Sequence, residues 1–160
     1  MVWAKNGTPN TLTVAGDLLT ITDLTGVKFN QFLVHKLQDG TSNAHGQINF
    51  NNDTSTNYAV RQSVNGGADS TAVSGGVLDI WQGYKDEFYV INVINISTEE
   101  KLFIGHVMEK NTTGAGNAPI RSEYIAKWAN TSDAITEIDV TNNGTGDYAI
   151  DSNISAHGTD

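Results

Sequence analysis

The sequence predicts an all-β fold, namely a single antiparallel β-sandwich that is jelly-roll-like and has about nine strands. Three observations predict it. Apolar and polar residues alternate over many short segments, and no stretch of about 11 residues carries the apolar stripe of an amphipathic helix. Turn-forming residues separate these segments at spacings of about 8 to 15 residues. We expect residues 1–10 to form an N-terminal arm and residues 11–160 to form one sandwich domain.

The first long strand is expected over residues 27–37, near the centre of a sheet. Because side chains alternate along a strand, one face carries apolar residues and the other carries mainly polar ones. The apolar face has Val27, Phe29, Leu33 and Leu37, and the other face has Lys28, Asn30 and Lys36. Phe32 and Val34 add apolar surface to this second face.

Three further long strands follow in the second half of the chain. Residues 88–96 are apolar on both faces and rich in β-branched residues, which predicts a strand buried on both faces. Residues 102–108 follow a short polar turn and predict the second arm of a hairpin. Over residues 120–128, apolar side chains alternate with Arg121, Glu123 and Lys127, which predicts a strand with one solvated face.

Shorter strands and turns complete the expected sandwich. Glycine-containing pairs and triplets supply the positive-φ positions that tight turns need, as at Asn65-Gly66-Gly67. The expected short strands cover residues 18–22, 47–50, 58–64, 77–81, 135–140 and 148–154.

The composition bounds the possible partners. The chain carries 9 basic and 18 acidic residues, a net charge of −9, which opposes nonspecific binding to nucleic acid or to an anionic membrane. We therefore expect no nucleic-acid and no membrane partner. Charged residues make up only 17% of the chain, and asparagine, threonine, serine and glycine replace them, so we expect a hydroxyl-rich and amide-rich surface.

The chain has no cysteine, which excludes disulfides and thiolate chemistry. The N-terminal residues lack the basic and apolar segments of a signal peptide, so we expect a protein that is made and folded in the host cytoplasm. Seven N-x-[ST] triplets occur, but without export we expect them to be unmodified.

Catalytic signatures are absent from the sequence. The four histidines are isolated and lack metal-binding spacing, and there is neither a nucleophile elbow nor a phosphate-binding loop. Residues 51–57 place oxygen ligands at alternate positions but lack the glycine and glutamate of a calcium loop. We expect no catalytic residues, no metal and no cofactor, and hence a protein that is not an enzyme.

Two places favour recognition. Residues 81–88 combine aromatic rings with amide and carboxylate groups, which suits sugar rings, although the same aromatic residues could instead close one end of the sandwich. The candidate glycan-binding residues are Trp81, Gln82, Tyr84 and Asp86. Trp3 lies on a short polar arm that cannot bury it unaided, so Trp3 and Lys5 are candidate anchors for assembly.

Three segments together resemble a pattern in small virion proteins of tailed phages and related environmental viruses. They are a strand, polar turn and returning strand with a glycine turn (48–67), a hairpin with an acidic turn (94–108), and a closing segment with a glycine turn (127–158). The pattern has a glycine-serine step before the last strand, and this chain has Asp151-Ser152 there instead. The resemblance implies a β-sandwich module of a head, neck or tail, and it carries no site residues with it.

These observations favour a non-enzymatic virion structural protein, a capsid decoration, spike or tail fibre subunit, that acts through self-assembly. We expect a homo-oligomer, most plausibly a trimer, that also contacts other virion proteins. The alternative from the binding class is a lectin-like module for a receptor or a host surface glycan, and a further alternative is a cellular surface filament subunit. The expected location is the virion, with the cation-free segment after Lys127 on its outer surface.

Overall fold

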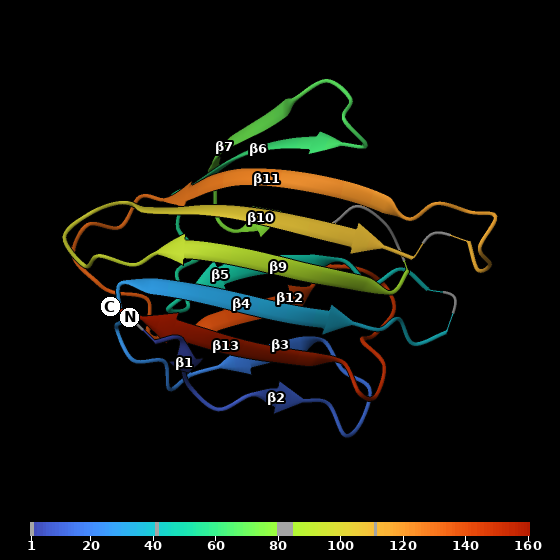
Figure 1. The fold of residues 1–160 in the computed structure, drawn as a ribbon, viewed down its shortest axis with the longest axis horizontal. Helices are drawn as coiled ribbons and strands as arrows, with labels where there is room; N and C mark the ends of the chain where they lie inside the picture. Colours follow the sequence, from blue (N-terminus) through green and yellow to red (C-terminus); the bar gives the residue numbers. More distant parts are fainter. Residues whose placement is uncertain (1, 41, 80–84, 111) are drawn as a thin grey trace.

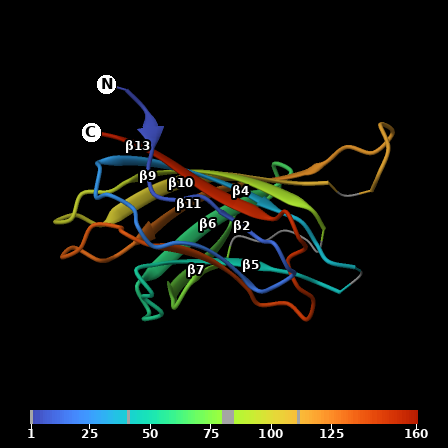
Figure 2. The ribbon, with the colours of Figure 1, turned by 90° about the horizontal axis from the view of Figure 1, so that it is seen from below.

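The computed structural model describes residues 2–40, 42–79, 85–110 and 112–160. It is an antiparallel β-sandwich of two unequal sheets, which confirms the predicted fold class. Figure 1 looks onto the large sheet, and Figure 2 shows the molecule turned by 90°.

The large sheet has nine strands in the order β1-β13-β4-β9-β10-β11-β6-β7, and β2 also pairs with β13. Its strands are β1 (Ala4–Lys5), β2 (Asn10–Thr11), β4 (Phe29–Lys36), β6 (Tyr58–Val64), β7 (Ser70–Gly75), β9 (Glu87–Ile94), β10 (Lys101–Glu109), β11 (Ile120–Trp128) and β13 (Asn153–Thr159). The small sheet consists of β3 (Leu18–Ile21), β12 (Ile138–Asn142), β5 (Gly46–Phe50) and β8 (Leu78–Asp79).

The chain crosses repeatedly between the two sheets, as jelly-roll-like sandwiches do, because most consecutive strands from β3 to β13 lie in different sheets. The exceptions are the hairpin β6-β7 and the meander β9-β10-β11, whose strands pair in sequence order. Residues of the expected arm belong to this sheet, since Ala4 pairs with Gly158 and Lys5 with His157. The two chain ends therefore lie side by side (Figure 1).

The core lies between the sheets and is mainly aromatic at one end. Trp128 is fully buried, stacks on Tyr58 with ring centroids 6.3 Å apart, and contacts Phe50 at 5.9 Å. The indole Nε1–H of Trp128 donates to Asp53 Oδ2 at 2.7 Å. The turn after β5 is thus tied to the end of β11.

The predicted alternation of side chains is confirmed in β11 and β4. In β11 the side chains of Tyr124, Ala126 and Trp128 are buried, as expected. In β4 the core face is the one that carries Asn30, Phe32, Val34 and Lys36, while Phe29 and Leu33 lie on the solvent side. The two polar side chains of this core face find partners inside the sandwich: Asn30 accepts from Asn6 at 2.7 Å.

The expectation that residues 88–96 are buried on both faces was wrong. The side chains of Tyr89, Ile91 and Val93 face the core, but those of Phe88 and Ile94 are exposed. The second apolar face belongs to the solvent side of the large sheet, which no other element of the described structure covers.

Asparagine has an interior role that composition alone did not predict. Asn6, Asn30, Asn49 and Asn95 are buried. Asn95 Oδ1 accepts from the Ile135 backbone N–H at 2.6 Å, so this side chain replaces a backbone partner in a segment without ladder bonds. Asn6 and Asn95 begin two of the N-x-[ST] triplets, and their burial leaves no room for a glycan.

Candidate functional site

The candidate site is the solvent side of the large sheet, called here the outer face. Cross-strand register places the outward side chains of four central strands in rows. One row runs through Phe29, Ile94, Leu102 and Lys127, and the next through Gln31, Asn92, Ile104 and Ile125. Because alternate residues share a face, these rows form one continuous surface.

Apolar side chains dominate this surface. Ile125 is 63% exposed, Leu102 is 53% exposed and Ile104 is 50% exposed, and Phe88 and Met108 add to them further along the strands. Four strands at about 4.8 Å spacing and eight residues at about 3.3 Å rise give roughly 500 Å² of projected sheet. Single exposed apolar residues are ordinary, but apolar side chains that adjoin one another across several strands form a patch, and such patches often mark interaction surfaces.

The patch is hollowed at one end. A depression of about 350 Å³ lies among side chains of β4, β9, β10 and β11 and the N-terminal segment. The residues whose side chains define this apolar hollow are Trp3, Phe29, Ile94, Leu102, Ile104 and Ile125.

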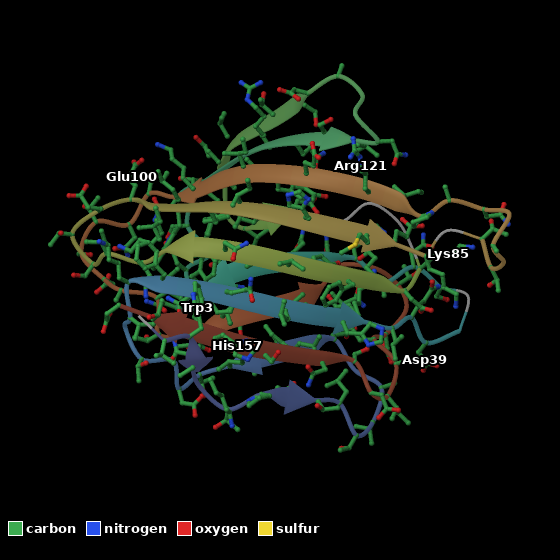
Figure 3. The ribbon with its side chains drawn as sticks, in the orientation of Figure 1. Trp3, Asp39, Lys85, Glu100, Arg121 and His157 are labelled. Atoms are coloured by element: carbon green, nitrogen blue, oxygen red, sulfur yellow. The ribbon has the colours of Figure 1, made fainter. Side chains whose placement is uncertain are left out.

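The two candidate anchors, Trp3 and Lys5, lie in the N-terminal segment near the hollow. Trp3 is 49% exposed and lines the apolar hollow, and Lys5 pairs in register with His157 on β13. Figure 3 shows Trp3 and His157 close together on the outer face. Lys28 Nζ lies 5.2 Å from the centroid of the Phe29 ring, a cation–π distance at the rim of the hollow.

The candidate glycan site is described only in part, because Trp81, Gln82 and Tyr84 lie outside the described residues. Asp86 is described, and it forms an ion pair with Lys110 at 2.9 Å. Burial raises the pKa of Asp86, but the hydrogen bonds from Lys110 and from the Gln38 backbone outweigh it and hold the pKa below its usual value. A polar depression of about 470 Å³ lies beside this pair.

A buried charged row, which the sequence did not predict, crosses the inner face of the same sheet. Lys36, Glu87 and Glu109 are opposite one another in β4, β9 and β10. The Lys36 ammonium lies 2.7 Å from Glu87 and donates to the Ala44 carbonyl at 2.6 Å, and both side chains of the ion pair are fully buried. The Tyr89 hydroxyl also donates to Glu87.

Space around this row is tight. A Cβ atom on Gly46 would lie 2.6 Å from the Tyr89 hydroxyl, so only glycine fits there without displacing the tyrosine. Burial, and then the charge of Glu87, raise the pKa of Glu109. Glu109 Oε2 has no hydrogen-bond partner. The row thus links β4, β9 and β10, and it encloses the carboxyl groups of Glu87 and Glu109 in the interior of the sandwich.

Within the described residues, no group of three histidine, aspartate or glutamate side chains is placed to hold a metal ion. Over the same ranges the structure contains no helix, and so none that is long and apolar enough to cross a membrane.

Comparisons with known proteins identify no family. No family model and no curated protein match the chain. One solved structure resembles this chain with a TM-score of 0.30 and 9% sequence identity. It comes from work on the cell entry of botulinum neurotoxin type C, which depends on interaction with two ganglioside molecules. The similarity covers 98% of this chain but 41% of that one, so the chain spans less than half of its length. A TM-score this low assigns neither a fold family nor a ligand to this chain.

Proposed function

We propose that this protein is a non-enzymatic structural subunit that acts by self-assembly through its outer face, as a decoration, spike or fibre subunit of a virion. The observation that carries the proposal is the continuous apolar patch on a sheet face that the described chain leaves uncovered. A standard protein interface buries about 800 Å² per partner, and a face of roughly 500 Å² would supply more than half of that area. Trp3 lies at the edge of the patch, where a large aromatic side chain is typical of interface anchors.

The virion setting rests on the resemblance of three sequence segments and on the cysteine-free, low-charge composition. A cellular surface filament subunit would use the same kind of face. The presence of the protein in gradient-purified particles separates the two settings.

The substitution Ile104→Asp tests the assembly face. A carboxylate at the centre of the patch loses apolar contact and must be desolvated, so we expect association to weaken at least about 30-fold, or about 2 kcal/mol. Sedimentation velocity should show the wild type as an oligomer and the variant as a monomer of 17.2 kDa.

Val73→Asp is the matched control, because Val73 is also an exposed aliphatic residue on a strand but lies on β7, outside the patch. We expect this variant to associate like the wild type. Equal association of all three proteins would remove the outer face from the proposal.

A lectin-like role is the second candidate, favoured by the polar depression beside the Asp86–Lys110 pair. A carboxylate that is fixed by an ion pair suits sugar hydroxyls. On a glycan array we expect Asp86→Asn to reduce binding about tenfold, since a hydrogen bond to a charged group contributes about 1.5 kcal/mol. Asp69→Asn, which also removes a carboxylate from a surface ion pair, serves as the control and should leave binding unchanged. Equal binding of both variants would exclude this site.

A further inference from the structure

Three of the four histidines of the chain lie on the outer face. His35 is on β4, His106 on β10 and His157 on β13, each on the solvent side of an alternating strand. The fourth, His45, directly precedes β5 of the small sheet. Figure 3 shows His157 on the outer face close to Trp3. Because histidine changes its charge between about pH 5 and 8, the charge of the proposed assembly face depends on pH near neutrality.

His106 lies within the apolar patch. On the outer side of β10 it stands between Ile104 and Met108, which are both exposed. Its cross-strand neighbour on β11 is Glu123, and this carboxylate lies 3.8 Å from the Arg121 guanidinium. A cation at His106 would therefore stand among apolar side chains, beside a carboxylate that already has a partner.

His35 lies further along the same face. It lines a depression of about 330 Å³ together with the apolar side chains of Phe88, Met108 and Pro119. The charged residues that also line this depression are Asp86, Glu87, Glu109 and Lys110. Asp86 is paired with Lys110 and Glu87 with Lys36, and Glu109 belongs to the buried row of the inner face. Protonation of His35 therefore adds a cation beside apolar side chains.

His157 lies toward the edge of the face that carries Trp3. Its partners in register are Lys5 on β1 and Gln31 on β4. Protonation would place a second cation beside Lys5, at the rim of the proposed contact. Like charges that are brought together in an interface oppose association.

The permanent charges of the face are mostly balanced within the chain. Lys127 Nζ lies 2.8 Å from Glu100, and the Arg61 guanidinium lies 3.1 Å from Asp69. Ordinary carboxyl groups keep their charge above about pH 5, so such pairs persist in mild acid. The protons taken up by the three histidines are therefore the charge that mild acid adds to this face.

We propose that mild acid releases the assembly, because the protonated histidines of the outer face resist burial against a second copy; this rests on the proposed self-assembly. Moving a cation from water into an apolar contact is unfavourable, so association favours the neutral imidazole. Association is at full strength above the ordinary histidine pKa of about 6.5 and is lost as the pH falls through that value. Exclusion of one proton weakens association about tenfold between pH 7.5 and 5.5, and exclusion of three weakens it about 1000-fold.

Sedimentation equilibrium at pH 7.5 and pH 5.5 tests the proposal. The wild type should associate at pH 7.5, and its association should weaken at least about tenfold at pH 5.5. The triple variant His35→Gln/His106→Gln/His157→Gln keeps polar side chains that do not titrate. It should associate like the wild type at pH 7.5 and change less than about twofold at pH 5.5. Glu109, whose burial raises its pKa, is retained in this variant, so its titration cannot account for a difference from the wild type.

His106→Lys is the matched control, since it places a permanent cation within the patch. We expect its association at pH 7.5 to be at least about tenfold weaker than that of the wild type, as if the histidine were protonated. Association of this variant equal to that of the wild type would contradict a role for the charge at this position. Circular dichroism at both pH values confirms that each protein is folded.

The outcomes separate this proposal from the proposed function. A wild type that associates equally at pH 7.5 and pH 5.5 keeps the assembly face and overturns release by acid. A triple variant that dissociates at pH 5.5 as the wild type does shows that other groups cause the release, and it also overturns the proposal. A wild type that is monomeric at both pH values contradicts the assembly face itself, and the histidine proposal with it.

Discussion

Replacement of Trp128 by alanine is expected to lower the free energy of unfolding by about 3 to 5 kcal/mol, enough to unfold much of a domain of ordinary stability. The ring is fully buried, contacts Phe50 and Tyr58, and lies with its centroid 5.5 Å from Lys101 Nζ. The substitution leaves a cavity and also removes the hydrogen bond to Asp53. Urea denaturation monitored by circular dichroism measures the loss.

Trp128→Phe is the matched control, since it keeps an aromatic ring and loses the Nε1–H donor. We expect a smaller loss, of about 1 to 3 kcal/mol. Burial raises the pKa of Asp53, but the hydrogen bonds from Asn57, Trp128 and Ser55 outweigh it and lower the pKa to about 2.

A lowered carboxyl pKa gives stability that is present above the ordinary value of 3.8 and is lost as the pH falls through about 2. The difference between the wild type and Trp128→Phe should therefore shrink in strong acid. A loss below about 1 kcal/mol for Trp128→Ala would show that the aromatic end of the core contributes little.

Lys36→Met is expected to cost about 3 to 5 kcal/mol at pH 7, because it leaves Glu87 buried without its cation. Glu109 lies beside Glu87 and brings a second carboxyl to the same enclosed space.

The double variant Lys36→Met/Glu87→Gln removes both charges of the pair. We expect it to recover most of the lost stability at pH 7, since a neutral replacement of a buried ion pair is often close to neutral in energy. Thermal and urea unfolding of the four proteins forms a double-mutant cycle. Full stability of Lys36→Met alone at pH 7 would contradict a buried, charged pair.

The sequence predicted those elements in which local pattern and burial agree. The turn after β5 is one of them: the Ser55 backbone N–H donates to Asp53 Oδ1 at 2.9 Å, and Tyr58 begins the returning strand as expected. β7 was missed because its serine, glycine and alanine residues are mostly exposed and show no apolar alternation. In β4 the partners that bury Lys36 and Asn30 lie on other elements, and no local pattern shows them.

The candidate site was predictable in one respect. Trp3 was expected to need a partner because its arm could not bury it, and the structure places it at the rim of the apolar hollow. The hollow itself is built from β4, from the consecutive strands β9, β10 and β11, and from the N-terminal segment, so no single segment could show it. The apolar second face of β9 was the available signal, although it was interpreted as burial within the chain.

The central claim is that the outer face is covered by another copy of the chain. Sedimentation equilibrium of the wild-type protein from about 1 to 100 μM tests this most directly. The account predicts a mass that rises with concentration to at least three times the chain mass of 17.2 kDa, with a trimer as the expected closed form. A single species of 17.2 kDa over the whole range would contradict it.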